Sequence, residues 1–173
     1  MQWSKLRSTV ESRFAPALGR RVSLHQARYR HANEALGRVW IAIDGRDAAS
    51  FASNDSRVEA GAEAERLMDE RDAWGSTAAY QQAMEEALDT VRAAGVYSDD
   101  DALAELHAFL SMPVDEALVA PSPLLRALAV LDARVGKRRL KALAASPDAH
   151  PLVRTLLAVR CDAEGVRTAP PAP

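Results

Sequence analysis

Many of the side chains best suited to chemistry gather around one short predicted hairpin. Guanidinium groups beside aromatic rings can bind a phosphate, a carboxylate or an unstacked base. The structural alternative is that the arginines stack on the rings and pair with acidic neighbours, which would complete one face of a sheet. We favour this structural role but keep the group as a candidate binding site, which consists of Arg28, Tyr29, Arg30, His31, Arg38, Trp40, Asp44 and Arg46.

A second group of cations lies late in the chain. Five cations within eight residues can neutralise phosphates and give salt-dependent nucleic-acid binding with little sequence readout. No aromatic residue lies within the segment to stack on bases, so we favour a solvated helix face or a partner for the acidic middle of the chain and keep nucleic-acid binding as the alternative. The group consists of Arg134, Lys137, Arg138, Arg139 and Lys141.

Charge is segregated along the chain, although the formal net charge is only −2. Residues 1–57 carry ten basic and five acidic side chains, residues 58–119 carry three and fifteen, and residues 122–161 carry eight and two. Such blocks suit basic and acidic faces that meet inside one fold or across a homodimer, and they also suit a basic surface for nucleic acid. We prefer the first explanation.

Motifs typical of common enzymes and metal sites do not occur in the sequence. It contains no Gly-x-Ser-x-Gly, P-loop, His-Glu-x-x-His or Gly-x-Gly-x-x-Gly pattern. The acidic run from Asp99 to Asp101 is explained by stabilisation of a helix N-terminus. Cys161 is the only cysteine, so an internal disulfide is excluded. We therefore assign no catalytic residue, no metal ligand and no cofactor.

The elements that position these residues follow from hydrophobic periodicity. Val39, Ile41 and Ile43 recur at every second position, which predicts a strand with one apolar face. Asp44-Gly45 suits a type I′ turn, in which both central residues need positive φ. We therefore expect a β-hairpin with strands at 38–43 and 46–52.

Helical spacing precedes and follows this hairpin. Trp3, Leu6, Val10 and Phe14 share one face of an amphipathic helix, and residues 20–29 suit a further strand. Beyond the hairpin the apolar spacing is helical to the end of the chain. We predict an α+β fold: an N-terminal helix plus a three-stranded antiparallel meander, followed by a bundle of about five or six helices.

The same pattern gives an expected domain organisation. Residues 1–55 should form a unit of helix and sheet, and residues 56–165 an all-helical unit packed on it as one domain. Residues 166–173 should be a disordered tail, because they end in Thr-Ala-Pro-Pro-Ala-Pro. The chain shows neither a secretory signal nor an apolar run long enough to span a membrane, so we expect a cytoplasmic protein without a membrane segment.

Several motifs together resemble a family of small, uncharacterised bacterial proteins. The resemblance implies a bacterial source and a single fold unit, and it brings no known activity or catalytic residue. The motifs are the opening Met-Gln-Trp-Ser-Lys-Leu, Arg28-Tyr29-Arg30-His31, Gly37-Arg38-x-Trp40-Ile41-x-Ile43-Asp44-Gly45, Leu131-Asp132-x-Arg134-Val135-Gly136-Lys137-Arg138 and Arg160-Cys161-x-Ala163-Glu164-Gly165.

Three functions are compatible with these observations. We expect a non-catalytic protein-interaction or accessory module, conceivably of the immunity type, whose partner is another protein or a second copy of the chain. The first alternative is nucleic-acid binding through the basic groups at 28–38 and 134–141. The second is a small enzyme with its site at the hairpin mouth.

Overall fold

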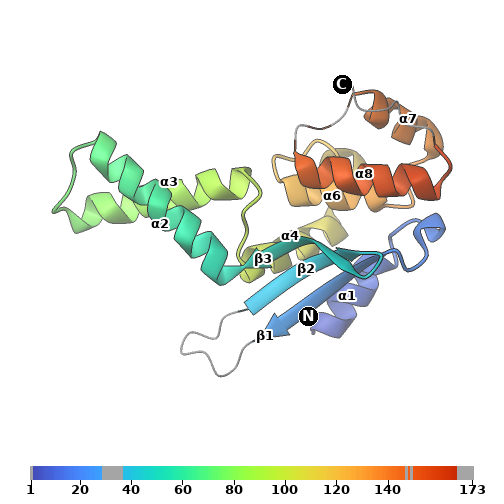
Figure 1. Ribbon diagram of the computed structural model, residues 1–173, viewed down its shortest axis with the longest axis horizontal. Coiled ribbons are helices and arrows are strands. Elements are labelled where there is room, and N and C mark those ends of the chain that lie inside the picture. The colour runs from blue at the N-terminus through green and yellow to red at the C-terminus, as the bar shows by residue number, and fades with distance from the viewer. Residues whose placement is uncertain (1, 29–36, 147, 149, 167–173) are drawn as a thin grey trace.

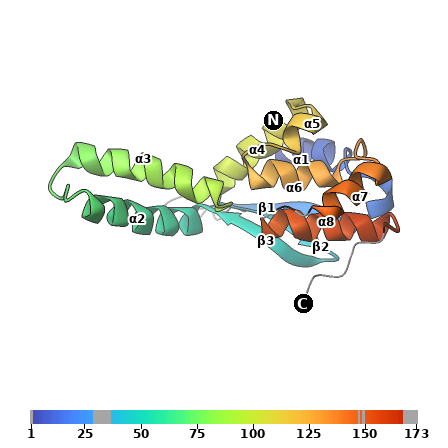
Figure 2. The ribbon, with the colours of Figure 1, turned by 90° about the horizontal axis from the view of Figure 1, so that it is seen from above.

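The computed structural model describes residues 2–28, 37–146, 148 and 150–166 of the 173-residue chain. Figure 1 shows a body that contains the sheet and most of the helices, and a two-helix arm that projects from it. Figure 2, seen from above, shows that the arm leaves the body where the last strand ends. The predicted disordered tail lies outside the described residues except for Val166, which is buried.

The N-terminal part forms the predicted helix and three-stranded sheet. The strands pair antiparallel in the order β1-β2-β3. Asp44 and Gly45, between β2 and β3, have φ of 49° and 78°, as the predicted type I′ turn requires. The elements are α1 (Trp3–Glu11), the short 3-10 helix η1 (Pro16–Leu18), β1 (Val22–Arg28), β2 (Gly37–Ile43) and β3 (Arg46–Ala52).

Helices make up the rest of the described chain, which confirms the predicted α+β class. Ser76, Ser98 and Ser122 cap three of these helices, because each side chain accepts a hydrogen bond from a backbone N–H of the first turn. Among the described residues, no helix combines the length and apolar character needed to cross a bilayer. The helices are α2 (Ser53–Glu70), α3 (Thr77–Ala93), α4 (Asp99–Ser111), α5 (Val114–Ala117), α6 (Pro123–Leu131), α7 (Lys137–Ala145) and α8 (Pro151–Ala163).

A continuous core joins the sheet to the helices of the body. The inner face of the sheet contributes Leu24, Val39, Ile41 and Phe51, and α1 and α4 pack against it. Every residue of α6 except Arg126 is buried, and this helix packs between α4 and α8. Because α6 has almost no solvated face, it is the central helix of the body.

The arm has a small apolar core of its own. Helices α2 and α3 pack antiparallel through a row of mostly small side chains, which lets the two backbones approach closely. The buried members of this row are Ala60, Ala64, Met68, Ala83, Ala87 and Val91, and they form a cluster separate from the main core. The sequence predicted both helices but not that they would leave the body as an arm.

The two late motif segments contact each other in the body. The guanidinium of Arg160 donates a hydrogen bond to the carbonyl oxygen of Val135 at 3.2 Å and another to the carboxylate of Glu164. Lys137 Nζ lies 3.5 Å from the same carboxylate. These contacts tie the end of α8 to the start of α7, so these motif residues have an architectural role.

Candidate functional site

The predicted site around the hairpin lies partly on the outer face of the sheet. His25 and Trp40 face each other across β1 and β2, with their rings stacked at a centroid distance of 5.0 Å. The Arg38 guanidinium lies over the Trp40 ring, with its central carbon 4.8 Å from the ring centroid. Its guanidinium also donates to Ser50 Oγ at 2.8 Å and to the Asp47 carboxylate at 2.6 Å. Arg38 thus stacks on Trp40 and pairs with Asp47 within the sheet.

The other members of this group do not converge on Arg38. Arg28 is exposed at the end of β1, near the start of β2, whereas Asp44 and Arg46 lie at the opposite end of the strands. At about 3.4 Å per residue, the six residues from Arg38 to Asp44 span roughly 20 Å. Tyr29, Arg30 and His31 lie outside the described residues.

The turn between β2 and β3 has a structural ion pair. The Arg21 guanidinium lies 3.1 Å from the Asp44 carboxylate and 2.5 Å from that of Asp162. The hydrogen bond from Arg21 lowers the pKa of Asp44, and the two carboxylates raise the pKa of Arg21. The lowered pKa makes the Asp44 carboxylate a weaker base, and the ion pair with Arg21 occupies it, so Asp44 is poorly suited to act as a general base.

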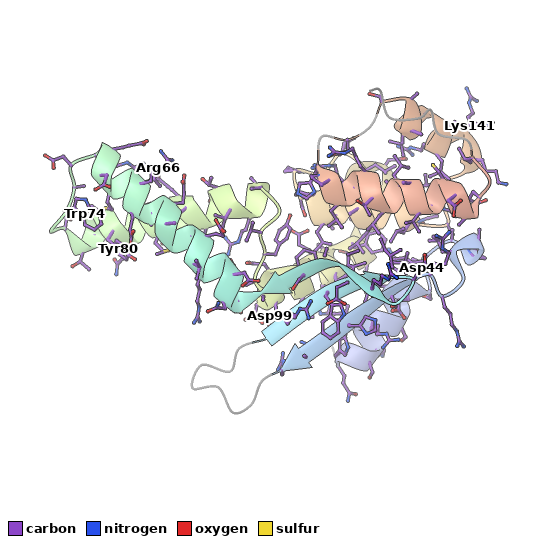
Figure 3. The ribbon with its side chains drawn as sticks, viewed as in Figure 1. Asp44, Arg66, Trp74, Tyr80, Asp99 and Lys141 are labelled. Atoms are coloured by element: carbon purple, nitrogen blue, oxygen red, sulfur yellow. The ribbon has the colours of Figure 1, made fainter. Side chains whose placement is uncertain are left out.

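The second predicted group lies on α7 and the turn before it. Arg138 and Lys141 are exposed. Figure 1 shows α7 on the far side of α8 from the sheet, and Figure 3 places Lys141 far from Asp99, which touches the start of β2. The two predicted basic groups are therefore not brought together. The other three cations have carboxylate partners: Arg134 with Asp132 at 2.7 Å, Lys137 with Glu164 at 3.5 Å, and Arg139 with Asp115.

The tip of the arm exposes two aromatic side chains that the sequence analysis did not single out as a site. Trp74 is 56% exposed in the turn between α2 and α3, and Tyr80 is 40% exposed on the first turns of α3. Figure 3 shows both at the end of the arm farthest from the body. The Trp74 indole N–H donates to the Asp69 carboxylate at 2.6 Å, which orients the ring.

The arm is also acidic. Residues 53–93 carry ten acidic side chains and four basic ones. Several of the acids pair within the arm, as Glu63 and Glu70 do with Arg66 and Glu86 does with Arg71. The excess of carboxylates gives the arm a negative potential that extends to its aromatic tip.

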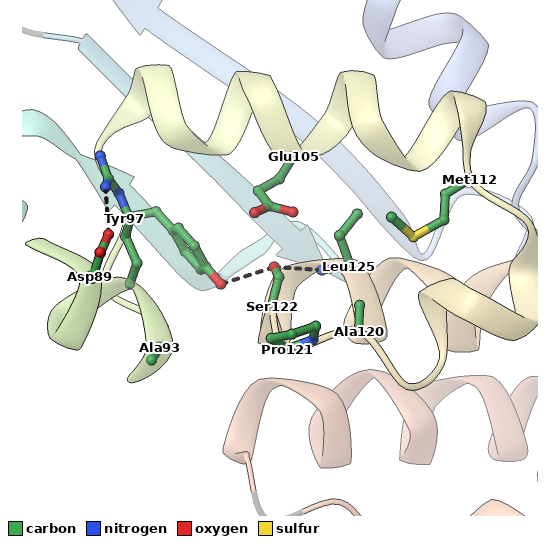
Figure 4. A pocket seen from close by; sticks show the side chains of 10 residues that line it. Asp89, Ala93, Tyr97, Glu105, Met112, Ala120, Pro121, Ser122 and Leu125 are labelled. Carbon is green, nitrogen blue, oxygen red and sulfur yellow. Dashed lines mark hydrogen bonds and ion pairs between the residues drawn. The ribbon is translucent and has the colours of Figure 1, made fainter.

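A cavity of about 420 Å³ lies where the arm joins the body (Figure 4). Its walls come from the end of α3, the α3–α4 loop, α4 and the segment that leads into α6. Apolar side chains form most of the surface, and five polar residues interrupt it. The lining consists of Asp89, Arg92, Ala93, Tyr97, Glu105, Met112, Ala120, Pro121, Ser122 and Leu125.

Three polar groups point toward one another inside this cavity. The Tyr97 hydroxyl and Ser122 Oγ are 3.0 Å apart, and Ser122 Oγ accepts a hydrogen bond from the Leu125 N–H at 3.2 Å. Figure 4 shows the Glu105 carboxylate extending from α4 toward this pair. Burial raises the pKa of Glu105, a hydrogen bond with the Ser122 side chain partly offsets that rise, and the negative charge of Asp101 adds to it. Burial also raises the pKa of Tyr97.

Sequence reasoning missed this cavity because its polar residues have no shared motif. They come from separate segments between residues 89 and 125. A serine directly before Pro123 is typical of a helix N-cap and gives no indication of a cavity. In the structure, Ser122 both caps α6 and lines the cavity. An acidic residue on the apolar side of α4 was the only other hint, since Glu105 lies one residue before the buried Leu106.

Comparisons with known proteins give one result. No curated protein and no solved structure matches the chain. The model of the SF0329 protein family matches residues 2–161. This match spans the helix, the sheet, the arm and the body down to Cys161, and it agrees with a resemblance that covers most of the chain. The protein therefore belongs to the SF0329 protein family.

Proposed function

We propose that this protein is a non-catalytic protein-binding module and that the α2–α3 arm is its binding element. The observation that carries the proposal is the 56% exposure of Trp74 at the tip of a projecting arm. Tryptophan and tyrosine are the residues that contribute most binding energy in protein interfaces. An arm with its own apolar core can present such a tip without disturbing the body.

The partner should be a protein with a basic surface around an apolar pocket. Charge complementarity favours such a surface, because the arm carries ten carboxylates against four cations. The pocket would take up the Trp74 ring and part of Tyr80, which would otherwise stay in water. A second copy of this chain is one possible source of the basic surface, since residues 122–161 are basic.

The other two candidate functions have less support. Nucleic-acid binding would require two basic groups that lie apart, and several of their arginines already pair with carboxylates. An enzyme at the hairpin mouth would have to use Asp44, which is held by Arg21. We further propose that the protein is bacterial, on the strength of the motif resemblance, and that it acts in the cytoplasm.

The proposal is tested by capture experiments with matched variants. Wild-type protein, Trp74→Ala, Trp74→Ala/Tyr80→Ala and Val119→Ala are immobilised and exposed to bacterial lysate, and captured proteins are identified and then purified. Val119 is 78% exposed on the body, so its variant controls for loss of an exposed apolar side chain elsewhere. Affinities of the purified partner are measured by calorimetry at low and high salt.

We expect the partner to lose about 2 kcal/mol of binding free energy with Trp74→Ala, which is about thirtyfold in Kd. Val119→Ala should bind as the wild type does, and binding should weaken with salt because the arm is acidic. A partner that binds the double variant unchanged would refute the role of the arm. Analytical ultracentrifugation of the wild type and the double variant shows whether the partner is a second copy.

A further inference from the structure

The cavity at the root of the arm has the size of a small-molecule site. Its volume of about 420 Å³ lies within the range of roughly 300–1,000 Å³ that is usual for ligand pockets. Such pockets are mostly apolar with a few placed polar groups, and this one combines Met112 and Leu125 with Tyr97, Glu105 and Ser122. The arm-tip aromatic residues lie at the other end of α2 and α3, so this cavity is independent of the binding function proposed for the arm.

Glu105 is only partly paired in this cavity, because its interaction with the Ser122 hydroxyl leaves one of its carboxylate oxygens without a partner in the described part of the chain. Among the described residues, its Oε2 is buried and has no hydrogen-bond partner. Buried polar atoms are almost always paired, so an orphaned carboxylate oxygen needs an explanation. The nearest lining cation, Arg92, is held by Asp101 at 3.0 Å and by Asp89 at 3.3 Å.

The charge of the lining favours a cation. Asp89 and Arg92 offset each other, and Glu105 remains as the uncompensated charge of the lining. Burial raises the pKa of Glu105, which is the expected result when a carboxylate has lost water without gaining a cation. A positive group placed beside it would reverse that shift.

The remaining polar atoms suit a primary ammonium group. Such a group has three N–H donors and no acceptor. The Glu105 carboxylate would accept one donor, and the hydroxyl oxygens of Tyr97 and Ser122 lie on the side toward which that carboxylate points. The walls formed by Met112 and Leu125 would contact an apolar remainder.

We propose that this cavity binds a small organic cation, with a primary ammonium group on a compact apolar body, and that Glu105 is its carboxylate partner. Charge-assisted hydrogen bonds of this kind are roughly twice as strong as neutral ones. An uncharged or anionic analogue would bind more weakly, because it would leave the buried Glu105 carboxylate without a cationic partner.

The test uses three probes of one shape on the full chain. Cyclohexylmethylamine, cyclohexylmethanol and cyclohexanecarboxylate are titrated into 15N-labelled protein, and amide shifts at Tyr97, Glu105 and Ser122 report occupancy. The series is repeated with Glu105→Gln and with Glu116→Gln, an exposed acid on α5 outside the cavity lining. Each variant must first give a dispersed spectrum like that of the wild type.

We expect the amine to bind at least tenfold more tightly than the alcohol, which corresponds to about 1.4 kcal/mol. Glu105→Gln should abolish this preference, and Glu116→Gln should keep it. Amine binding should strengthen as the pH rises above about 4.5, because Glu105 ionises with a pKa raised from that ordinary value. The other titratable or charged groups that face Glu105 are Tyr97, Asp101 and the Arg92–Asp89 pair.

Three results would overturn the proposal. The alcohol or the carboxylate could bind as tightly as the amine, the preference for the amine could survive in Glu105→Gln, or the amine could cause no shift at these three amides at millimolar concentration. A loss of partner binding by arm-tip variants would not alter any of these readouts, so failure of one proposal is distinguishable from failure of the other.

Discussion

Replacement of Glu164 by glutamine should destabilise the protein although the two side chains have nearly the same shape. The Arg160 side chain is only 3% exposed, and Glu164 is its carboxylate partner one helical turn away. After the replacement, the buried cation would keep the Val135 carbonyl as its hydrogen-bond partner. In the part of the chain that the structure describes, Arg160 Nε has no hydrogen-bond partner, so little compensation remains.

The size of the effect follows from the burial of each partner. A buried charge that loses its partner typically costs about 3–5 kcal/mol, and we expect about 3 kcal/mol for Glu164→Gln. Arg160→Met should cost less, about 2 kcal/mol, because Glu164 is 16% exposed and keeps Lys137 at 3.5 Å. The double variant leaves no unpaired charge, so it should cost about 3 kcal/mol rather than the sum of the single effects.

Urea denaturation followed by circular dichroism gives the free energy of unfolding of the wild type, the two single variants and the double variant. Lys137→Met is the control, because its ammonium group is exposed and exposed pairs contribute about 0–1 kcal/mol. A coupling free energy near zero between Arg160 and Glu164 would refute the reasoning. A cost below about 1 kcal/mol for Glu164→Gln would also refute it, since the cation would then be solvated in a way that its burial does not suggest.

Three other predictions concern single positions. Gly37→Ala should lower the free energy of unfolding in urea by about 2–4 kcal/mol, because the new Cβ would lie 1.7 Å from the Asp99 carboxylate. Gly61→Ala should raise it by about 0.5–1 kcal/mol, because its Cβ would meet nothing within 4 Å and alanine favours the helix. A destabilising Gly61→Ala or a neutral Gly37→Ala would contradict this. Burial tends to raise the pKa of Asp101, but hydrogen bonds from Ser98 and Arg92 outweigh that effect, so the pKa is lowered. The ionised Asp101 therefore stabilises the folded state at pH 7, and Asp101→Asn should reduce stability there. This loss of stability should shrink below about pH 3.8, where the carboxyl becomes protonated. Glu105 has a raised pKa, so it binds protons more tightly in the folded state; Glu105→Gln should therefore increase stability at pH 7, and the gain should vanish below about pH 4.5. Thermal melts of both variants and of the wild type from pH 3 to pH 8 test whether Asp101→Asn destabilises and Glu105→Gln stabilises at neutral pH. The two predictions would be wrong if the stability differences from wild type changed with pH in the same way for both variants.

Much of the fold could be predicted because its signals are local. Alternation of side chains around Trp40 defines a strand, positive φ at Asp44 and Gly45 defines the turn, and serine hydroxyls at Ser98 and Ser122 define helix starts. Each depends on residues within one or two turns of the chain. The short helix α5 was missed, because four residues carry too little periodicity to detect.

The candidate sites were harder to predict because they depend on contacts between distant residues. The sequence suggested a cluster around Arg38 and Trp40, and these two residues do meet, since residues two apart in one strand lie on the same face of the sheet. It gave no indication that Tyr97, Glu105 and Ser122 would line one cavity. Their positions depend on how α4 packs against α6, which no periodicity encodes.

The sequence by itself determined the α+β class, the order of the elements, the hairpin turn and the segregated charge. Only the tertiary structure decided that α2 and α3 leave the body as an acidic arm and that several cations of the basic groups are already paired. It also decided that, within the described part of the chain, one buried oxygen of the Glu105 carboxylate has no partner at the root of the arm. The physical reason is the range of the interactions. Backbone hydrogen bonds and periodic burial are set by neighbours in the chain, whereas the partner of a charge or the solvation of an aromatic ring is set by whichever distant surface packs beside it.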